Sequence, residues 1–172
     1  MSRTESGFTL VELVVAILIL AILIGMAFPN FSSTMRSNRI ATRANEFIAS
    51  VSLARSEAIK NNVGAGICAS PDGAVCGTDW NAGWMVFSDL NGSGTFNAGD
   101  TVMRTSSGST SMSFTTPTAG GILMFDNRGI YTGAVNTTFV MTPTDCPASY
   151  IGKRSFSLMI TGQLSMQKLA CP

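Results

Sequence analysis

Apolar residues form one long uninterrupted segment near the start of the chain. Residues 8–28 are apolar apart from the small polar Thr9 and the carboxylate of Glu12. A helix over this segment would be about 31 Å long, enough to cross a bilayer core of about 30 Å. We therefore predict a membrane-spanning helix over 8–28, kinked or locally loosened by Gly25 and Pro29.

The pattern then changes to that of an amphipathic helix over 29–62. Its apolar residues recur at three- and four-residue steps: Ile40, Ala44, Phe47, Val51, Ala54 and Ala58. Such a stripe buries one face of a helix against a soluble domain. The charged residues lie mostly off the stripe, where we expect a solvated face: Arg36, Arg39, Arg43, Glu46, Arg55 and Lys60. Asn61, Asn62 and Gly64 are typical of a helix end.

From residue 63 onward the apolar runs are short and separated by Gly, Ser, Thr and Asn. These runs are VGAGICAS, GWMVFSD, TVMRTS, SMSFTT, GILMFDNRG, TTFVMTP, RSFSLMITG and LSMQKLAC. Turn residues at such intervals are typical of a meander of strands. We predict an α+β fold, in which residues 63–172 form one antiparallel β domain packed against the helix.

Composition limits the functions that this chain can have. Its 172 residues suffice for one sizeable core, and 11 basic against 10 acidic residues provide no overall field that would gather nucleic acid. Histidine is absent, and the sequence contains no phosphate-binding loop, supported carboxylate pair or nucleophile–base pair. We expect neither an enzyme nor a cofactor or metal site.

Glu12 is the unusual residue of the apolar segment. A carboxylate within a membrane span costs roughly 2.5–3.5 kcal/mol and is a functional candidate by default, unless it lies at headgroup level. A secretory signal would place its small cleavage-site residue after the apolar stretch, whereas Gly7 comes before it. Cleavage at Gly7 would leave the hydrophobic segment on the mature protein.

Gly7 followed by FTLVE resembles the class III leader of type IV pilins and type II secretion pseudopilins. The resemblance implies that residues 1–7 are a leader, that a prepilin peptidase cuts between Gly7 and Phe8, and that Phe8 is then N-methylated. It further implies that Glu12 faces the amino terminus of a neighbouring subunit in the filament. The expected partners are this peptidase and methylase, the inner membrane before assembly, and other major and minor pilins through the N-terminal helix.

LARSEAIKNN, followed by GWMVFSDLNGSGTFNAGD, resembles the GspH/FimT/FimU group of minor pilins and pseudopilins, its FimU-like members above all. The resemblance implies a type IV pilin-like fold with a periplasmic head that reaches the cell surface after assembly. The implied function is a minor pilin that helps to prime the pilus and lies at or near its tip, in twitching motility and adhesion. A GspH-like minor pseudopilin of a type II secretion system is the alternative.

FimT-like members supply a further alternative, a DNA receptor for natural transformation. Their basic GRxR motif matches this chain at Gly162, but Gln163 and Ser165 occupy the arginine positions. Without these cations the phosphate contacts are lost, so we do not expect DNA binding. Lys153, Arg154 and Lys168 could replace them in part, although outward lysines also protect sheet edges.

The four cysteines allow three disulfide pairings. A zinc site is the rival, but no C-x(2–4)-C spacing occurs, and export to an oxidising compartment favours disulfides. We expect Cys68 with Cys76 and Cys146 with Cys171, which would contribute at most about 2.6 and about 3.5 kcal/mol in the chain-entropy treatment.

DLNGSGTFNAGD follows the spacing of a calcium-binding loop from Asp89 to Asp100, but it has only two carboxylates. We interpret it as an oxygen-rich hairpin, with calcium binding as the alternative. Two tryptophans flank the preceding NAG: we expect Trp84 in the core and Trp80 over the nearby disulfide loop.

Overall fold

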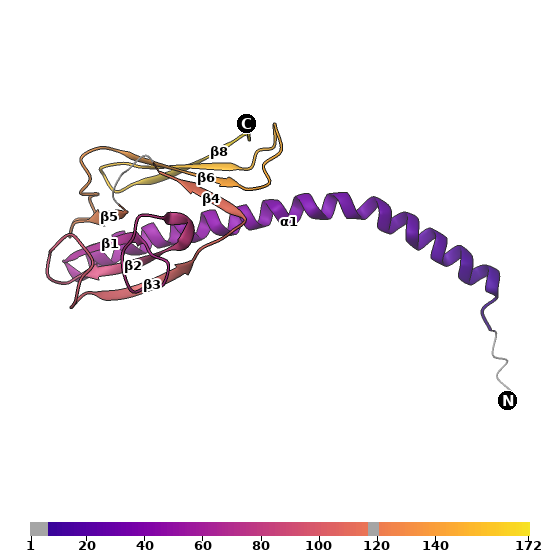
Figure 1. The fold of residues 1–172 in the computed structure, drawn as a ribbon, viewed down its shortest axis with the longest axis horizontal. Coiled ribbons are helices and arrows are strands. Elements are labelled where there is room, and N and C mark those ends of the chain that lie inside the picture. Colours follow the sequence, from indigo (N-terminus) through magenta and orange to yellow (C-terminus); the bar gives the residue numbers. More distant parts are fainter. Residues whose placement is uncertain (1–6, 117–120) are drawn as a thin grey trace, which may run out of the picture. The chain divides into compact units, whose positions relative to one another are not determined.

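A computed structural model describes residues 7–116 and 121–172, without the side chains of 26–32. The leader over 1–7 therefore lies almost wholly outside the described residues. The chain divides into two compact units, Met1–Arg39 and Ile40–Pro172. Helix α1, Leu10–Asn61, contributes residues to both units, so the second unit includes the last part of the helix as well as all the strands (Figure 1).

Helix α1 begins two residues later and ends one residue earlier than predicted. Asn62 ends it in the left-handed conformation with φ 55°, which asparagine tolerates better than most residues do. The helix is assigned without a break through Gly25. The kink at Gly25 and Pro29 stays a prediction, because the Pro29 side chain lies outside the described ones.

The eight short apolar runs all form strands. They are β1 Gly64–Ala69, β2 Gly83–Asp89, β3 Thr101–Ser107, β4 Met112–Thr115, β5 Ile122–Phe125, β6 Thr137–Pro143, β7 Lys153–Leu158 and β8 Leu164–Leu169, with a short 3-10 helix, η1 Trp80–Ala82, before β2. All pairings are antiparallel, so the α+β prediction is confirmed.

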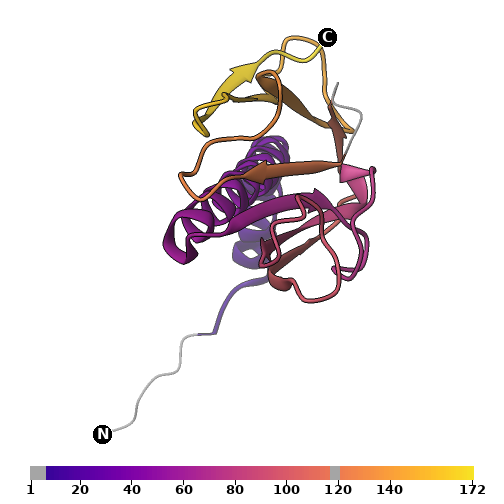
Figure 2. The same ribbon diagram turned by 90° about the vertical axis from the view of Figure 1, so that its left-hand side faces the viewer.

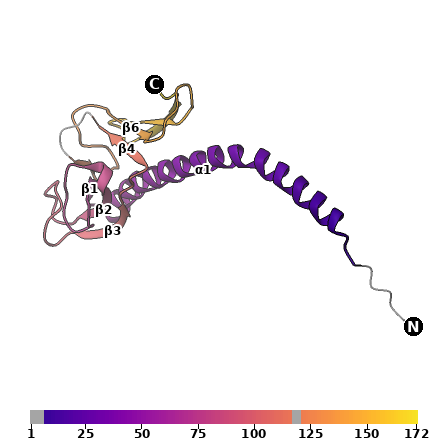
Figure 3. The same cartoon turned by 45° about the vertical axis from the view of Figure 1, so that its right-hand side comes forward.

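The strands do not form a single meander, however, and this part of the expectation is wrong. They form two four-stranded sheets with the orders β3-β2-β1-β5 and β4-β6-β7-β8. Figures 1 and 3 show β1, β2 and β3 on one side of the C-terminal half of α1, and β4 and β6 on the other. Figure 2 shows the yellow β8 well away from the magenta strands. Both sheets contribute buried residues to the core around the helix's apolar stripe.

The predicted helical stripe is the centre of the core. All six of its residues, from Ile40 to Ala58, are buried, together with inward-facing residues of both sheets. Phe47 has no exposed surface and contacts five aromatic rings: Trp80, Trp84, Phe114, Phe139 and Phe156. The prediction of Trp84 in the core is confirmed. Trp80 lies in this core too, so its expected place over the disulfide loop is wrong.

The charged residues of the helix do not form a simple solvated face. Arg43 donates hydrogen bonds to Glu46 at 2.7 Å and to the Ser107 carbonyl at 2.6 Å, and its guanidinium lies over the Trp84 ring at 4.8 Å. Ser106 donates to Glu46 at 2.6 Å. These contacts attach the helix to strand β3, which periodicity could not predict, because β3 is more than fifty residues away along the chain.

Candidate assembly and processing site

The N-terminal part of α1 presents an apolar surface. The large hydrophobic side chains from Phe8 to Ile24 are between 47% and 79% exposed. Glu12 is the one ionisable residue from 7 to 25. Within the described residues, no helix combines the length and hydropathy needed to cross a membrane. The span predicted over 8–28 includes three side chains outside the described ones.

Thr9 caps this helix. Its hydroxyl oxygen accepts the Glu12 backbone N–H at 3.3 Å, and its carbonyl accepts the Leu13 N–H at 3.2 Å, the first helical bond. Gly7 and Phe8 therefore lie just outside the helix, both exposed. Sequence reasoning missed the role of Thr9. The signature of a capping box, Thr followed three residues later by Glu, could have revealed it.

At the other end of α1, Arg55 joins three segments of the second unit. Its Nε donates to the carbonyl of Gly129 at 3.0 Å and its Nη2 to the carbonyl of Thr161 at 3.3 Å. Gly162 has φ +78°, and a Cβ at this position would clash with the Gly129 carbonyl oxygen. Glycine is therefore required here for packing.

The turn that carries Gly129 is held by Asp126. The carboxylate accepts hydrogen bonds from the backbone N–H groups of Arg128 and Ile130, each at 2.9 Å. It also forms an ion pair with the Arg128 guanidinium at 2.8 Å. Burial, the largest single influence, raises the pKa of Asp126, but these hydrogen bonds together lower the pKa below its ordinary value. The ionised carboxylate therefore stabilises the turn against which Arg55 is anchored.

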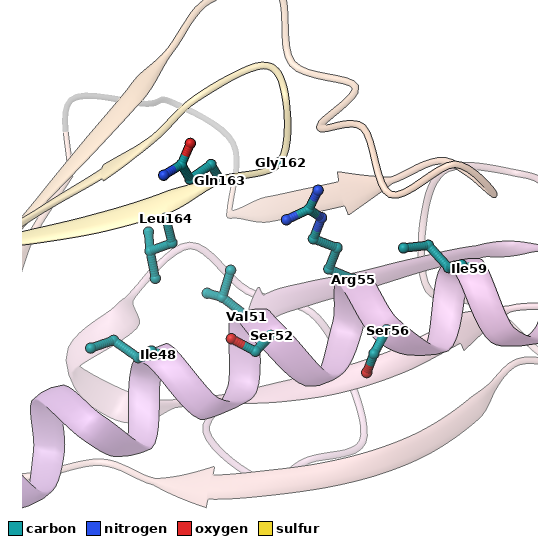
Figure 4. A pocket seen from close by; sticks show the side chains of 9 residues that line it. All are labelled: Ile48, Val51, Ser52, Arg55, Ser56, Ile59, Gly162, Gln163 and Leu164. Carbon is teal, nitrogen blue, oxygen red and sulfur yellow. The ribbon is translucent and has the colours of Figure 1, made fainter.

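A groove of about 370 Å³ lies beside this contact, between the last turns of α1 and the start of β8 (Figure 4). Its walls include Ile48, Val51 and Leu164, with Arg55 and Gln163 at its polar end. The Arg55 guanidinium already donates to two carbonyls, so the groove contains no uncommitted cation for a phosphate. It is a shallow apolar surface.

Among the described residues, the fold does not bring Lys153, Arg154 and Lys168 together on one exposed face beside the stretch that matches GRxR. Gln163 is exposed and Ser165 is half-buried. Arg154 is only 5% exposed and donates to the carbonyls of Ile151 and Lys153, so it does not serve as the partial substitute that the DNA alternative would need. Lys168 is exposed on the edge strand β8, a position where lysine discourages strand addition.

The loop from Asp89 to Asp100 connects the antiparallel strands β2 and β3 and uses its carboxylates internally. Asp89 accepts the N–H groups of Ser93 at 3.0 Å and Gly94 at 2.8 Å, while Asp100 accepts those of Leu90 and Asn97. In the described part of the chain, no three His, Cys, Asp or Glu residues are grouped as metal ligands would be. These hydrogen bonds hold the oxygen-rich hairpin in its conformation.

Both disulfides have the pairing expected from the sequence. Cys68 and Cys76 are bonded with their Cα atoms 5.6 Å apart, as are Cys146 and Cys171. Cys68 belongs to a small second core on the outer face of the first sheet, with Met85, Phe87 and Met124. The other disulfide attaches the end of the chain to the segment before β7.

Two family descriptions match the sequence. "Type II transport protein GspH" matches residues 43–163, and "Prokaryotic N-terminal methylation motif" matches residues 2–28. The methylation motif implies processing by a prepilin peptidase and assembly with other pilins. The pilin family implies anchoring in the inner membrane by the N-terminal segment, followed by transfer into the filament.

Similar proteins agree with this assignment. "Pilin-like protein PilA1" of Thermus thermophilus is 30% identical over 147 residues, which is 81% of this chain and 87% of that protein. Two crystal structures of the Pseudomonas aeruginosa type IV minor pilin FimU resemble the fold, with TM-scores of 0.56 and 0.57 at 24% and 22% identity. They cover 76% and 74% of this chain, and 89% and 91% of theirs. On these grounds the chain belongs to the GspH family of minor pilins and pseudopilins, structural subunits, not enzymes, of type IV pili or type II secretion systems.

Proposed function

We propose that this protein is a minor pilin that helps to prime assembly of a type IV pilus and lies at or near the pilus tip. The observation that carries the proposal is the exposed apolar segment of residues 8–24, with Glu12 as its one ionisable group, inside the match to the methylation motif over residues 2–28. The likeness of the fold to a minor pilin of a type IV pilus supports a pilus over a secretion system.

In this proposal the peptidase cuts between Gly7 and Phe8, and the new amino group of Phe8 is methylated. Both residues are exposed and outside the helix, which supports access by an enzyme. Residues 8–28 then anchor the subunit in the inner membrane, with residues 63–172 as a periplasmic head. The two disulfides suit that oxidising compartment.

Glu12 sets the register of assembly. When the apolar segment leaves the membrane it must be covered by helices of neighbouring pilins, because side chains this exposed cannot remain in water. A buried carboxylate without a partner is strongly destabilising, whereas one paired with the amino terminus of a neighbour is not. A wrong register leaves Glu12 unpaired, so the pair selects one arrangement.

The test is incorporation of Glu12→Ala and Glu12→Gln subunits into pili. We expect both precursors to be processed and inserted in the membrane as in the wild type, with the amount in sheared pili reduced roughly tenfold or more, as for a lost buried pair. Ser52→Ala, an exposed change on the same helix, is the control. Normal pilus levels of Glu12→Ala would contradict the pairing.

A deletion strain separates the pilus from the secretion system. We expect loss of surface pili and twitching, with type II secretion intact and with recovery on complementation. Normal pili with failed secretion would identify a minor pseudopilin instead. Normal pili with failed DNA uptake would favour a DNA receptor.

A further inference from the structure

We infer that Thr9 is a positioning residue for precursor processing, an inference that rests on the proposed cleavage between Gly7 and Phe8. Thr9 ends helix α1 on its N-terminal side. This keeps the Gly7–Phe8 peptide bond in exposed, non-helical backbone, where the peptidase can bind it.

The hydrogen bonds around Thr9 explain how the helix is stopped. In an α-helix extended by one more turn, the Glu12 N–H would donate to the Phe8 carbonyl and the Val11 N–H to the Gly7 carbonyl. The Thr9 hydroxyl instead accepts the Glu12 N–H at 3.3 Å, and the helical pattern starts with Leu13 donating to the Thr9 carbonyl at 3.2 Å. Extension of the helix must break the cap.

The residues on either side make this stop necessary. From Leu10 to Ile24 the chain is an unbroken helix, and a formed helix adds residues at its ends far more easily than it nucleates. Gly7 opposes extension because glycine is a poor helix former, but Phe8 has no such strong preference. Thr9 is the residue whose side chain closes the end.

The Gly7 carbonyl is where the reaction takes place. Water adds to its carbon, the bond to the Phe8 nitrogen breaks, and the products are a Gly7 carboxylate and a Phe8 amine. A carbonyl that accepts a helical hydrogen bond is held in the helix and must be released first. Cleavage then depends on the population of the open form. The cap keeps that population high.

The test measures the rate at which a prepilin peptidase cleaves the full-length precursor in membrane vesicles. The cleavage products are detected by their intact mass. Thr9→Ala removes the hydroxyl and adds a strong helix former, Thr9→Val removes the hydroxyl but keeps the shape, and Thr9→Ser keeps the hydroxyl. We expect Thr9→Ala and Thr9→Val to slow cleavage roughly 2- to 30-fold, because loss of an N-cap changes the population of the open form by about this factor. Thr9→Ser should be cleaved at the wild-type rate.

A second readout follows the backbone itself. Carbonyl and Cα chemical shifts of labelled Gly7 and Phe8 in detergent micelles should move toward helical values in Thr9→Ala and stay extended in Thr9→Ser. A wild-type cleavage rate in Thr9→Ala, or slow cleavage in Thr9→Ala but not in Thr9→Val, would overturn the capping role. A wild-type precursor that is not cut between Gly7 and Phe8 would instead overturn the proposed processing, and with it the inference.

Discussion

Phe47 offers the sharpest test of how the helix stabilises the head. Its side chain is fully buried, and its ring lies 5.0–6.1 Å from five other aromatic rings. Replacement of a buried Phe by Ala costs about 3–5 kcal/mol, and the cost rises with the cavity that remains. The five rings come from η1, β2, β4, β6 and β7, so they cannot all move into one vacancy. We expect a cost near the upper end.

The assay is unfolding of the full chain by guanidinium in detergent micelles. The chain has two tryptophans, Trp80 and Trp84, and both contact Phe47, so their fluorescence follows this core directly. Ile59→Ala on the same helix is the control, because Ile59 is 50% exposed and should cost less than about 1 kcal/mol. A Phe47→Ala cost below about 1 kcal/mol would refute the central place of this ring.

Three further changes test the second unit by the same unfolding assay. The buried Trp84 indole N–H donates to the Ser50 hydroxyl at 3.0 Å, and Ser50→Ala removes this acceptor. The change should lower the free energy of unfolding by about 1–3 kcal/mol, and a loss of stability near zero would contradict this. The double variant Cys146→Ser with Cys171→Ser should lose up to about 3.5 kcal/mol of stability. Under non-reducing conditions it should therefore unfold at a lower denaturant concentration than the wild type. The pKa of Asp126 is lower in the folded state, so its contribution is present above about pH 4 and disappears as pH falls through the folded pKa. Asp126→Asn should therefore differ in stability from the wild type at pH 6, and the difference should shrink progressively as the pH is lowered below about 4.

Local patterns predicted the elements of this fold well. The apolar period of 3.6 identified the six buried residues of the helix, from Ile40 to Ala58, because a helix that packs by one face needs that spacing. Turn residues separated the eight strands for an equally local reason. The likeness to a leader peptide pointed to Gly7, Phe8 and Glu12, since processing depends on residues adjacent in sequence.

Contacts between distant segments were beyond such reasoning. The sequence did not indicate that Trp80 would join the main core, or that Arg154 would be buried against backbone carbonyls. Nor could it indicate that Arg55 would bond to Gly129 and Thr161, which are 74 and 106 residues away. Each of these depends on which strands pair, and strand pairing involves segments that periodicity does not relate.

The sequence by itself therefore determined the secondary structure, the apolar face of the helix and the family, because these follow from spacing and short motifs. Only the tertiary structure decided that the strands divide into two sheets around one helix. It also decided which charges are used internally, as at Asp89 and Arg43. The physical reason is that burial and hydrogen bonding satisfy each polar group with whatever partner the folded chain brings near, whatever its distance in sequence.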